Sequence, residues 1–235
     1  MLDGVTLRRL QALATAHLAD ACLRAAMTVR CAPSAIKGVM PSMRCEGIVR
    51  PARHAGSVDV FLEALANASP GDVLVVDNEG RADEACVGDL VALETKQAGL
   101  SGIVIWGLHR DTAELLDIGL PVFSAGSLPA GPLGVRARHF EALMNAQIGA
   151  WCVSVDDVVV ADADGVLFLP KQGLGDVIEI AEQIRDTERR QADLMAKGRT
   201  LREQTNFDAY LNLVKESPGY GFREHLRAVN GAIET

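Results

Sequence analysis

Three charged side chains stand at a spacing that suits metal-assisted chemistry on an oxo acid. Asp89 is followed by 20 residues (90 to 109) and then by Arg110 and Asp111. An arginine presents a rigid donor fork to a carboxylate or an enolate oxygen, and a neighbouring carboxylate can hold a hard divalent cation. Together they would stabilise charge that develops on a carbonyl oxygen. A plainer interpretation also fits: Arg110 and Asp111 form a surface pair, and Asp111 caps a helix.

The surrounding pattern predicts how these residues meet. Short apolar runs at 73–76 and 103–106 are typical of buried strands, and the segment 85–98 carries apolar residues at helical spacing. Two strands joined through a helix usually lie parallel, so the loops after them share one edge of the sheet. Gly88, Asp89, Leu90 and Val91 are expected near the first turn of the helix, where backbone N–H groups suit a carboxylate or phosphate.

The rest of the chain indicates an α/β protein with a helical end. We expect helices at 6–27, 57–68 (capped by Ser57), 112–118, 175–195 and 200–214, and a hairpin turn at the Asp-Gly pair of 162–165. The segment 124–133 is an uncharged loop suited to packing against a neighbour, and the tail 217–235 is expected to pack on another subunit or fray. These patterns predict one domain over 1–195 and a helical arm over 196–235.

Composition restricts the partners. The 235 residues carry a formal charge of −8 with 4% aromatic residues, which argues against nucleic-acid binding, while an acidic surface still suits a basic protein. No apolar run is long enough for a transmembrane helix, and the N-terminus lacks the pattern of a signal peptide. Five scattered cysteines without C-x-x-C spacing indicate buried thiols in a reducing cytoplasm.

Several strings together resemble one family. These are GDVLVVD (71–77), GDLVALE (88–94), AGLSGIVIWGLHRD (98–111), IGLPVFSAG (118–126) and DADGV (162–166). They are similar, in content and order, to the family of the regulator of ribonuclease activity A and the class II 4-hydroxy-4-methyl-2-oxoglutarate aldolases, whose signature is Asp, twenty residues, then Arg-Asp. The resemblance spans roughly residues 8 to 190. It implies an α/β/β/α sandwich with a swivelling central sheet, assembled as trimers or pairs of trimers with active sites between subunits.

The resemblance also implies a role for each matching residue. The backbone of Gly88, Asp89, Leu90 and Val91 would hold a pyruvate-type carboxylate, and Arg110 would hold the enolate oxygen. Asp111 would hold Mg²⁺ or Mn²⁺, directly or through waters, and Asp89 would position a water that moves a proton. The implied reaction is retro-aldol cleavage of a 4-hydroxy-2-oxo diacid to pyruvate and a second oxo acid, with oxaloacetate decarboxylation as a side activity.

Some positions depart from the family pattern or stay open. Aldolase members carry a glutamate near the C-terminus that reaches a neighbouring site, whereas this chain has Arg199 there and Glu203 four residues on. Thr15 and Asp20 resemble a Thr/Ser-then-Asp pair of the family's first helix. Arg53 or His54 is a candidate for a distal substrate carboxylate, or a solvated loop pair.

Two other functions remain as alternatives. One is a non-catalytic regulator that binds and inhibits a ribonuclease or another protein, as the ribonuclease regulator of this family does. The other is a hydrolase or a different metal-enolate enzyme on the same scaffold. Some family members carry a methyltransferase label, but no G-x-G loop follows the first strand, which argues against a nucleotide-like cofactor.

Overall fold

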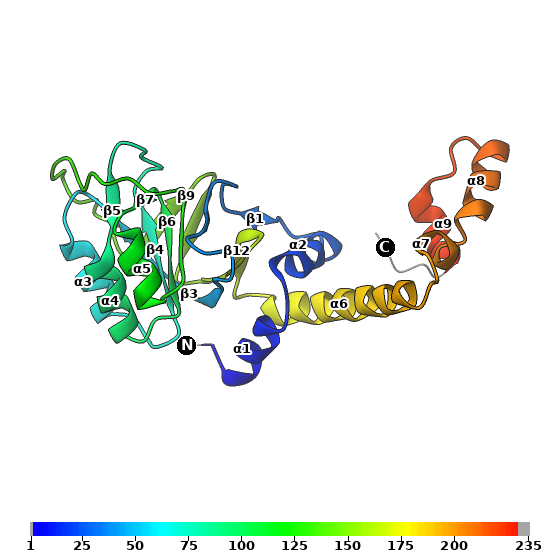
Figure 1. Ribbon diagram of the computed structural model, residues 1–235, viewed down its shortest axis with the longest axis horizontal. Coiled ribbons are helices and arrows are strands. Elements are labelled where there is room, and N and C mark those ends of the chain that lie inside the picture. Colours follow the sequence, from blue (N-terminus) through cyan, green and yellow to red (C-terminus); the bar gives the residue numbers. More distant parts are fainter. Residues whose placement is uncertain (1, 230–235) are drawn as a thin grey trace.

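A curled eight-stranded sheet forms the centre of the computed structural model, which describes residues 2–229 (Figure 1). The strand order is β1-β12-β11-β3-β4-β6-β8-β2. Strands β3 (Cys45–Arg53), β4 (Val73–Asp77), β6 (Gly102–Trp106) and β8 (Val122–Ser124) are parallel, and β2 (Lys37–Gly38) closes their edge antiparallel. The other half, β11 (Asp157–Asp162), β12 (Gly165–Pro170) and β1 (Arg30–Cys31), is antiparallel.

The curl of the sheet makes four layers, and alternation along the strands shows why. In β4, Leu74 and Val76 pack against helices on one side, while Val73 and Val75 pack into the interior of the curl. In β11, Val159 and Ala161 enter that same interior and Val158 and Val160 face the helices of the opposite side. Both halves are therefore buried on both faces. The expected α/β/β/α layering is confirmed.

Helices α3 (Asp59–Ala66), α4 (Asp89–Gln97) and α5 (Thr112–Ile118) cover the parallel half. Helices α1 (Gly4–Gln11), α2 (Thr15–Arg24) and α6 (Leu174–Ala196) cover the antiparallel half. Two small ribbons complete the body: β9 (Asn145–Ile148) with β10 (Trp151–Ser154), and β5 (Ala85–Val87) with β7 (Leu108–His109). The hairpin expected at 162–165 joins β11 to β12, as predicted.

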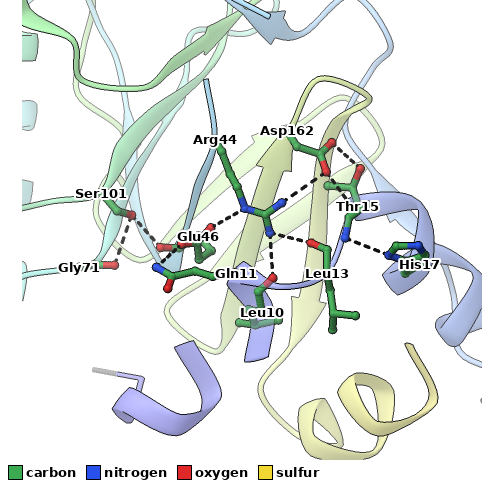
Figure 2. A network of polar contacts seen from close by, with 11 residues as sticks. Leu10, Gln11, Leu13, Thr15, His17, Arg44, Glu46, Gly71, Ser101 and Asp162 are labelled. Carbon is green, nitrogen blue, oxygen red and sulfur yellow. Dashed lines mark hydrogen bonds and ion pairs between the residues drawn. The ribbon is translucent and has the colours of Figure 1, made fainter. Parts of the chain in front are cut away.

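The single helix expected at 6–27 is wrong, because a polar network breaks it (Figure 2). Arg44 donates through Nη2 to the carbonyls of Leu10 at 2.8 Å and Leu13 at 2.7 Å. The Thr15 amide donates to Asp162 Oδ2 at 2.8 Å instead of to a carbonyl one turn earlier. These long-range partners replace intrahelical hydrogen bonds, so α1 ends and α2 begins at a new angle.

Several other expected elements change at their ends. Helix α3 begins at Asp59 rather than at Ser57, and its N-cap is Val58. The last helix expected at 200–214 is two helices, α7 (Leu201–Gln204) and α8 (Phe207–Glu216), because Asn206 adopts a left-handed φ of 49° between them. The tail forms a further helix, α9 (Phe222–Ala228), as far as residue 229; the last six residues of the expected tail lie outside the described residues.

The C-terminal helices stand apart from the sheet. Figure 1 shows α6 projecting beyond the body, with α7, α8 and α9 gathered at its far end. Aromatic contacts hold them together: the Tyr210 ring centroid lies 5.0 Å from that of Phe222 and 5.5 Å from that of His225.

No helix among residues 2–229 has the length and hydropathy needed to cross a membrane. The expectation of buried thiols holds for Cys22, Cys45 and Cys86 but is wrong for Cys31 and Cys152, which are exposed.

Candidate active site

The β5–β7 ribbon brings the predicted site residues together. Its strands are parallel, with Val87 opposite His109, so the residues that follow each strand are neighbours. The amide of Arg110 donates to the carbonyl of Val87 at 2.9 Å and fixes this register. Asp89 therefore begins α4 beside Asp111, which precedes α5. The juxtaposition predicted from the sequence is present, although the strand β5 that produces it lies where a helix was expected.

Asp111 occupies the N-cap position of α5, but its carboxylate does not cap that helix. Its backbone is left-handed, with φ 57° and ψ 45°, a conformation that Asp tolerates better than most residues. Its Oδ2 lies 3.3 Å from Arg110 Nε and accepts a hydrogen bond from the Asp89 amide at 3.3 Å. The plainer interpretation is thus half right: Arg110 and Asp111 are paired, but the carboxylate is turned toward the start of α4.

The start of α4 already attracts carboxylate oxygens. Asp111 Oδ2 accepts from the amide of Asp89, and Asp89 Oδ1 accepts from the amide of Leu90 at 2.7 Å. Gly88 is the N-cap residue and has no side chain to compete for these donors. Free N–H groups and the positive end of the helix dipole favour negative charge at this point. The carboxylates of Asp89 and Asp111 thus lie where the carboxylate of a small ligand would be stabilised.

A pocket of about 250 Å³ opens at this helix start. Its lining includes Gly88, Asp89, Leu90, Val91 and Arg110, all five predicted from the sequence. Asp111 is not part of the lining and lies directly behind Gly88. The remaining wall is mostly apolar and comes from the segment between β3 and α3, from α3 itself, from β5 and from the loop after β8: His54, Val58, Phe61, Ala85, Cys86 and Pro132.

The loop after β8 belongs to this site, contrary to the expectation that it only packs against a neighbour. Pro132 lines the pocket, and Gly131 lies so close to Arg110 Nη1 that a Cβ there would be 2.6 Å away. Buried Glu84 ties the loop down, because its carboxylate accepts from the Leu133 amide at 2.9 Å and from Arg136 Nη1 at 3.2 Å. Burial alone would raise the pKa of Glu84, but these donors and Arg81 hold it below its ordinary value.

His109 is a structural histidine. It is buried, its Nδ1 lies 2.6 Å from Ser124 Oγ, and its Nε2 lies 3.1 Å from Thr112 Oγ1. Burial lowers its pKa, so the ring stays neutral near pH 7. With both nitrogens engaged by hydroxyls, it fixes the end of β7 against β8 and α5. This fixes the direction in which Arg110 and Asp111 leave the strand.

Arg53 and His54 were expected in a loop, but Arg53 is the last residue of β3 and His54 follows it, and the two side chains separate. Arg53 is bound to Asn145 and lies 3.7 Å from Asp77, away from the pocket lining. His54 lines the pocket, is 5% exposed, and has its pKa lowered chiefly by burial. The solvated-pair interpretation is therefore wrong for His54, and a neutral imidazole is a poor counter-ion for a distal carboxylate.

Other candidates from the sequence lie elsewhere. Thr15 is buried and donates from Oγ1 to Asp162 Oδ1 at 2.7 Å, while Asp20 is exposed on α2. Glu203 accepts from the Thr200 amide at 2.7 Å in a capping box at the start of α7. Figure 1 shows α7 far from α4 within this chain. Within one chain, Glu203 therefore has a local role in capping α7 and lies away from the pocket.

A divalent cation suits one side of this site. Within residues 2–229, no three Asp, Glu, His or Cys side chains gather as a closed metal cage. Mg²⁺ does not require one, because it usually binds one or two carboxylates and keeps waters or substrate oxygens. Asp111 supplies a hard oxygen donor, and a Cβ at position 88 would collide with its Oδ2. The missing side chain at Gly88 lets this oxygen lie against the start of α4, and one such carboxylate is the kind of ligand that Mg²⁺ commonly takes.

Comparison with known proteins identifies the family. A model of the RraA-like family, described as Aldolase/RraA, matches residues 15–168. The protein belongs to this family. A protein of Halalkalibacterium halodurans named "Putative 4-hydroxy-4-methyl-2-oxoglutarate aldolase" is 30% identical over 171 residues, which are 69% of this chain and 76% of that protein. An uncharacterized protein of Methanocaldococcus jannaschii, MJ0644, is 31% identical over 136 residues, 58% of this chain and 64% of its own.

Solved structures share the fold of this RraA-like protein. An uncharacterized protein from Pseudomonas syringae superimposes with a TM-score of 0.73 at 24% identity, covering 85% of this chain and 96% of that one. Streptomyces coelicolor RraAS2, described as an unusual member of the RNase ES inhibitor RraA protein family, gives a TM-score of 0.69 at 25% identity, covering 80% and 96%. The family thus contains proteins named as aldolases and proteins named as ribonuclease inhibitors.

Proposed function

We propose that this RraA-like protein is a divalent-metal-dependent lyase that cleaves a 4-hydroxy-2-oxo acid by a retro-aldol reaction to pyruvate and a second oxo compound. The observation that carries the proposal is the meeting of Asp89, Arg110 and Asp111 at the start of α4, beside a pocket. A regulator that acts only through its surface would not require an arginine and two carboxylates gathered at the start of a helix beside a pocket.

In this proposal, one group of the chain binds the substrate carboxylate and another stabilises the enolate. The helix start at Gly88 to Val91 binds the substrate carboxylate and orients the adjacent 2-oxo group toward Arg110. When the carbon–carbon bond breaks, its electron pair becomes the pyruvate enolate, and Arg110 stabilises the negative charge on the enolate oxygen.

The two carboxylates have different tasks in this proposal. Asp111 would hold Mg²⁺ or Mn²⁺, and the ion supplies further positive charge to the oxygens of the oxo acid. Asp89, which lines the pocket, positions the water that returns a proton to the enolate carbon. Loss of carbon dioxide from oxaloacetate yields the same enolate, so decarboxylation is the expected side activity.

The test measures pyruvate released from 4-hydroxy-4-methyl-2-oxoglutarate and from oxaloacetate, with Mg²⁺ or Mn²⁺ and then with chelator. We expect metal-dependent release from both compounds. Removing a single preorganised donor to a developing oxyanion typically costs about 10² to 10³ in rate, so Arg110→Ala should lose at least that much in both reactions. Asp111→Ala should abolish the metal dependence and weaken Mn²⁺ binding measured by calorimetry.

A matched control is Asp117→Ala, which removes an exposed carboxylate from the same helix, α5, without touching the pocket. It should retain wild-type turnover and Mn²⁺ binding. Undiminished activity in Asp111→Ala would remove Asp111 from the reaction. No release from either compound by a folded wild-type protein would contradict the proposed activity.

The second candidate is a regulator that binds a ribonuclease or another protein. The acidic charge of −8 and the likeness to S. coelicolor RraAS2, an unusual member of the RNase ES inhibitor RraA protein family, favour it. A pull-down with the purified protein tests this candidate, with Arg110→Ala as a second bait. Recovery of the same RNA-processing protein by both baits supports a regulator that acts independently of the pocket, and recovery of none by either bait counts against it.

A further inference from the structure

Four titratable side chains line the pocket, and one of them, an imidazole, is well suited to accept a proton from a neutral hydroxyl. The Arg110 guanidinium has donors but no acceptor, and burial raises the pKa of the Cys86 thiol. Asp89 has Oδ1 engaged by the Leu90 amide at the helix start. The fourth is His54, an imidazole whose pKa is lowered, first by burial, so that it is neutral near pH 7.

The His54 ring is held in one orientation. It stacks on Phe61 of α3 with ring centroids 5.2 Å apart and planes 10° from parallel. Its Nδ1 lies 2.9 Å from Asn78 Oδ1, and its own amide donates to the carbonyl of Asp77 at 2.9 Å. Arg136 Nη2 donates to its carbonyl at 3.4 Å. The ring therefore has one fixed edge, toward Asn78, and one edge left for the pocket.

The free edge carries the second ring nitrogen. When Nδ1 donates to Asn78 Oδ1, Nε2 carries a lone pair. Within residues 2–229, no hydrogen bond engages Nε2, in contrast to His109, where hydroxyls engage both nitrogens. A histidine oriented through one nitrogen, with the other left for a ligand, has the arrangement of a general base.

We propose that His54 Nε2 accepts the proton of the substrate's C4 hydroxyl during retro-aldol cleavage. The proposal rests on the proposed function and assigns a residue for a step that Arg110 and Asp111 do not supply. It also places C4, with its substituent, toward His54, Val58 and Phe61 at the α3 side of the pocket, while the substrate carboxylate lies at the start of α4.

The step is balanced without a further reactant. The hydroxyl proton passes to Nε2, and the O–H electron pair becomes the second bond of the new C4 carbonyl. The C3–C4 bond breaks, and its pair forms the C2–C3 double bond of the pyruvate enolate, with the charge on the C2 oxygen beside Arg110. One proton then adds to C3 from water, and the imidazolium returns its proton to solvent.

Two reactions of the same site separate this role from enolate stabilisation. Cleavage of a 4-hydroxy-2-oxo acid requires removal of a hydroxyl proton, whereas oxaloacetate decarboxylation has no hydroxyl to deprotonate. His54→Asn keeps an amide near Asn78 and lacks Nε2, and His54→Gln keeps a polar group that cannot take up a proton. We expect both variants to lose about 10² or more in kcat for cleavage. Decarboxylation should fall by a much smaller factor, and Arg110→Ala should lose both reactions together.

The control is His17→Gln, which removes a ring that lies 3.2 Å from Glu188. His17 belongs to α2, and Figure 1 shows α2 far from α4. Circular dichroism confirms that each variant is folded, and added imidazole should restore part of the cleavage rate of His54→Ala. Equal losses in the two reactions, or no loss in cleavage, would overturn the assignment of His54 alone. A wild-type protein that releases no pyruvate from either compound overturns the proposed function and this inference with it.

Discussion

Gly88 is a residue whose small size the site requires. Its φ of −132° is open to any residue, so the requirement comes from space: a Cβ would collide with Asp111 Oδ2 and approach Arg110 Nε to 3.2 Å. We expect Gly88→Ala to displace the carboxylate from the start of α4 and to lower pyruvate release by at least about 10², as for the loss of an oriented catalytic group. Steady-state kinetics and Mn²⁺ calorimetry measure both effects.

Gly175→Ala in α6 is the matched control for that substitution. A Cβ at Gly175 meets nothing within 4 Å, and alanine is favoured over glycine inside a helix by about 0.5 to 1 kcal/mol. This control should keep full activity and unfold at slightly higher denaturant. Wild-type kinetics in Gly88→Ala would show that the Asp111 carboxylate does not need its observed position.

Glu84 makes the stability of the pocket loop depend on pH. Its folded-state pKa lies below the ordinary value of 4.5, because the Leu133 amide, Arg136 and Arg81 outweigh the effect of burial. The stabilisation is therefore fully present above about pH 4.5 and is lost as the pH falls through the lower folded-state pKa. Glu84→Gln should lose stability at pH 7 and show a weaker acid dependence than wild type in urea unfolding from pH 3 to 7.

The exposed Glu216 on α8 provides the comparison for this pH series. Glu216→Gln should leave the acid dependence of unfolding unchanged. If Glu84→Gln also follows the wild-type profile, then the acid sensitivity of the protein arises from other carboxylates, and the loop is held by its remaining contacts.

At the scale of elements, local pattern predicted most helices and strands but not the element that assembles the site. The run of 85–98 was expected to be one helix, whereas Ala85 to Val87 form strand β5, and α4 begins at Asp89 with Gly88 as its N-cap. A run of only three residues is too short for the spacing of its apolar side chains to distinguish a strand from a helix. Their state is decided by pairing with β7, a partner more than twenty residues away. The same limit applies to Pro132 and Glu84, whose roles exist only after the loop folds back.

The break between α1 and α2 has the same origin and yields a prediction. Arg44 joins the carbonyls of Leu10 and Leu13 to Glu46, and its Nη1 lies 3.8 Å from Asp162 (Figure 2). Arg44→Met keeps the length of the side chain and leaves Glu46, which is 7% exposed, without this cation. Because Arg44 itself is partly exposed, we expect a loss of about 2 to 3 kcal/mol in urea unfolding, below the cost at a fully buried pair.

Arg24→Met at the exposed end of α2 makes the same chemical change away from the network. It should change the free energy of unfolding by less than about 0.5 kcal/mol, as is usual at the surface. Equal effects in the two variants would mean that packing of α1 and α2 on the sheet, rather than Arg44, holds the N-terminal helices.

At the scale of the whole molecule, an apolar groove of about 270 Å³ lies between α3 and α4, next to the pocket. Val58, Leu62 and Leu90 expose 49%, 50% and 76% of their surface there. Such a cluster at the mouth of a site is more than the scattered exposed apolar residues of an ordinary surface. It agrees with the expectation, drawn from the resemblance, that copies of the chain assemble as a trimer or hexamer around their active sites.

The oligomer prediction is tested by placing a charge in this groove. We expect the wild type to run as a trimer or hexamer in size-exclusion chromatography with light scattering, and Leu62→Glu to shift the population toward monomer, because a carboxylate would be desolvated at the interface. Leu23→Glu on α2, where leucine is 65% exposed on the opposite side of the sheet, should leave the assembly intact. A wild type that is monomeric at tens of micromolar would contradict the prediction, and the groove would then have to be covered by a different protein.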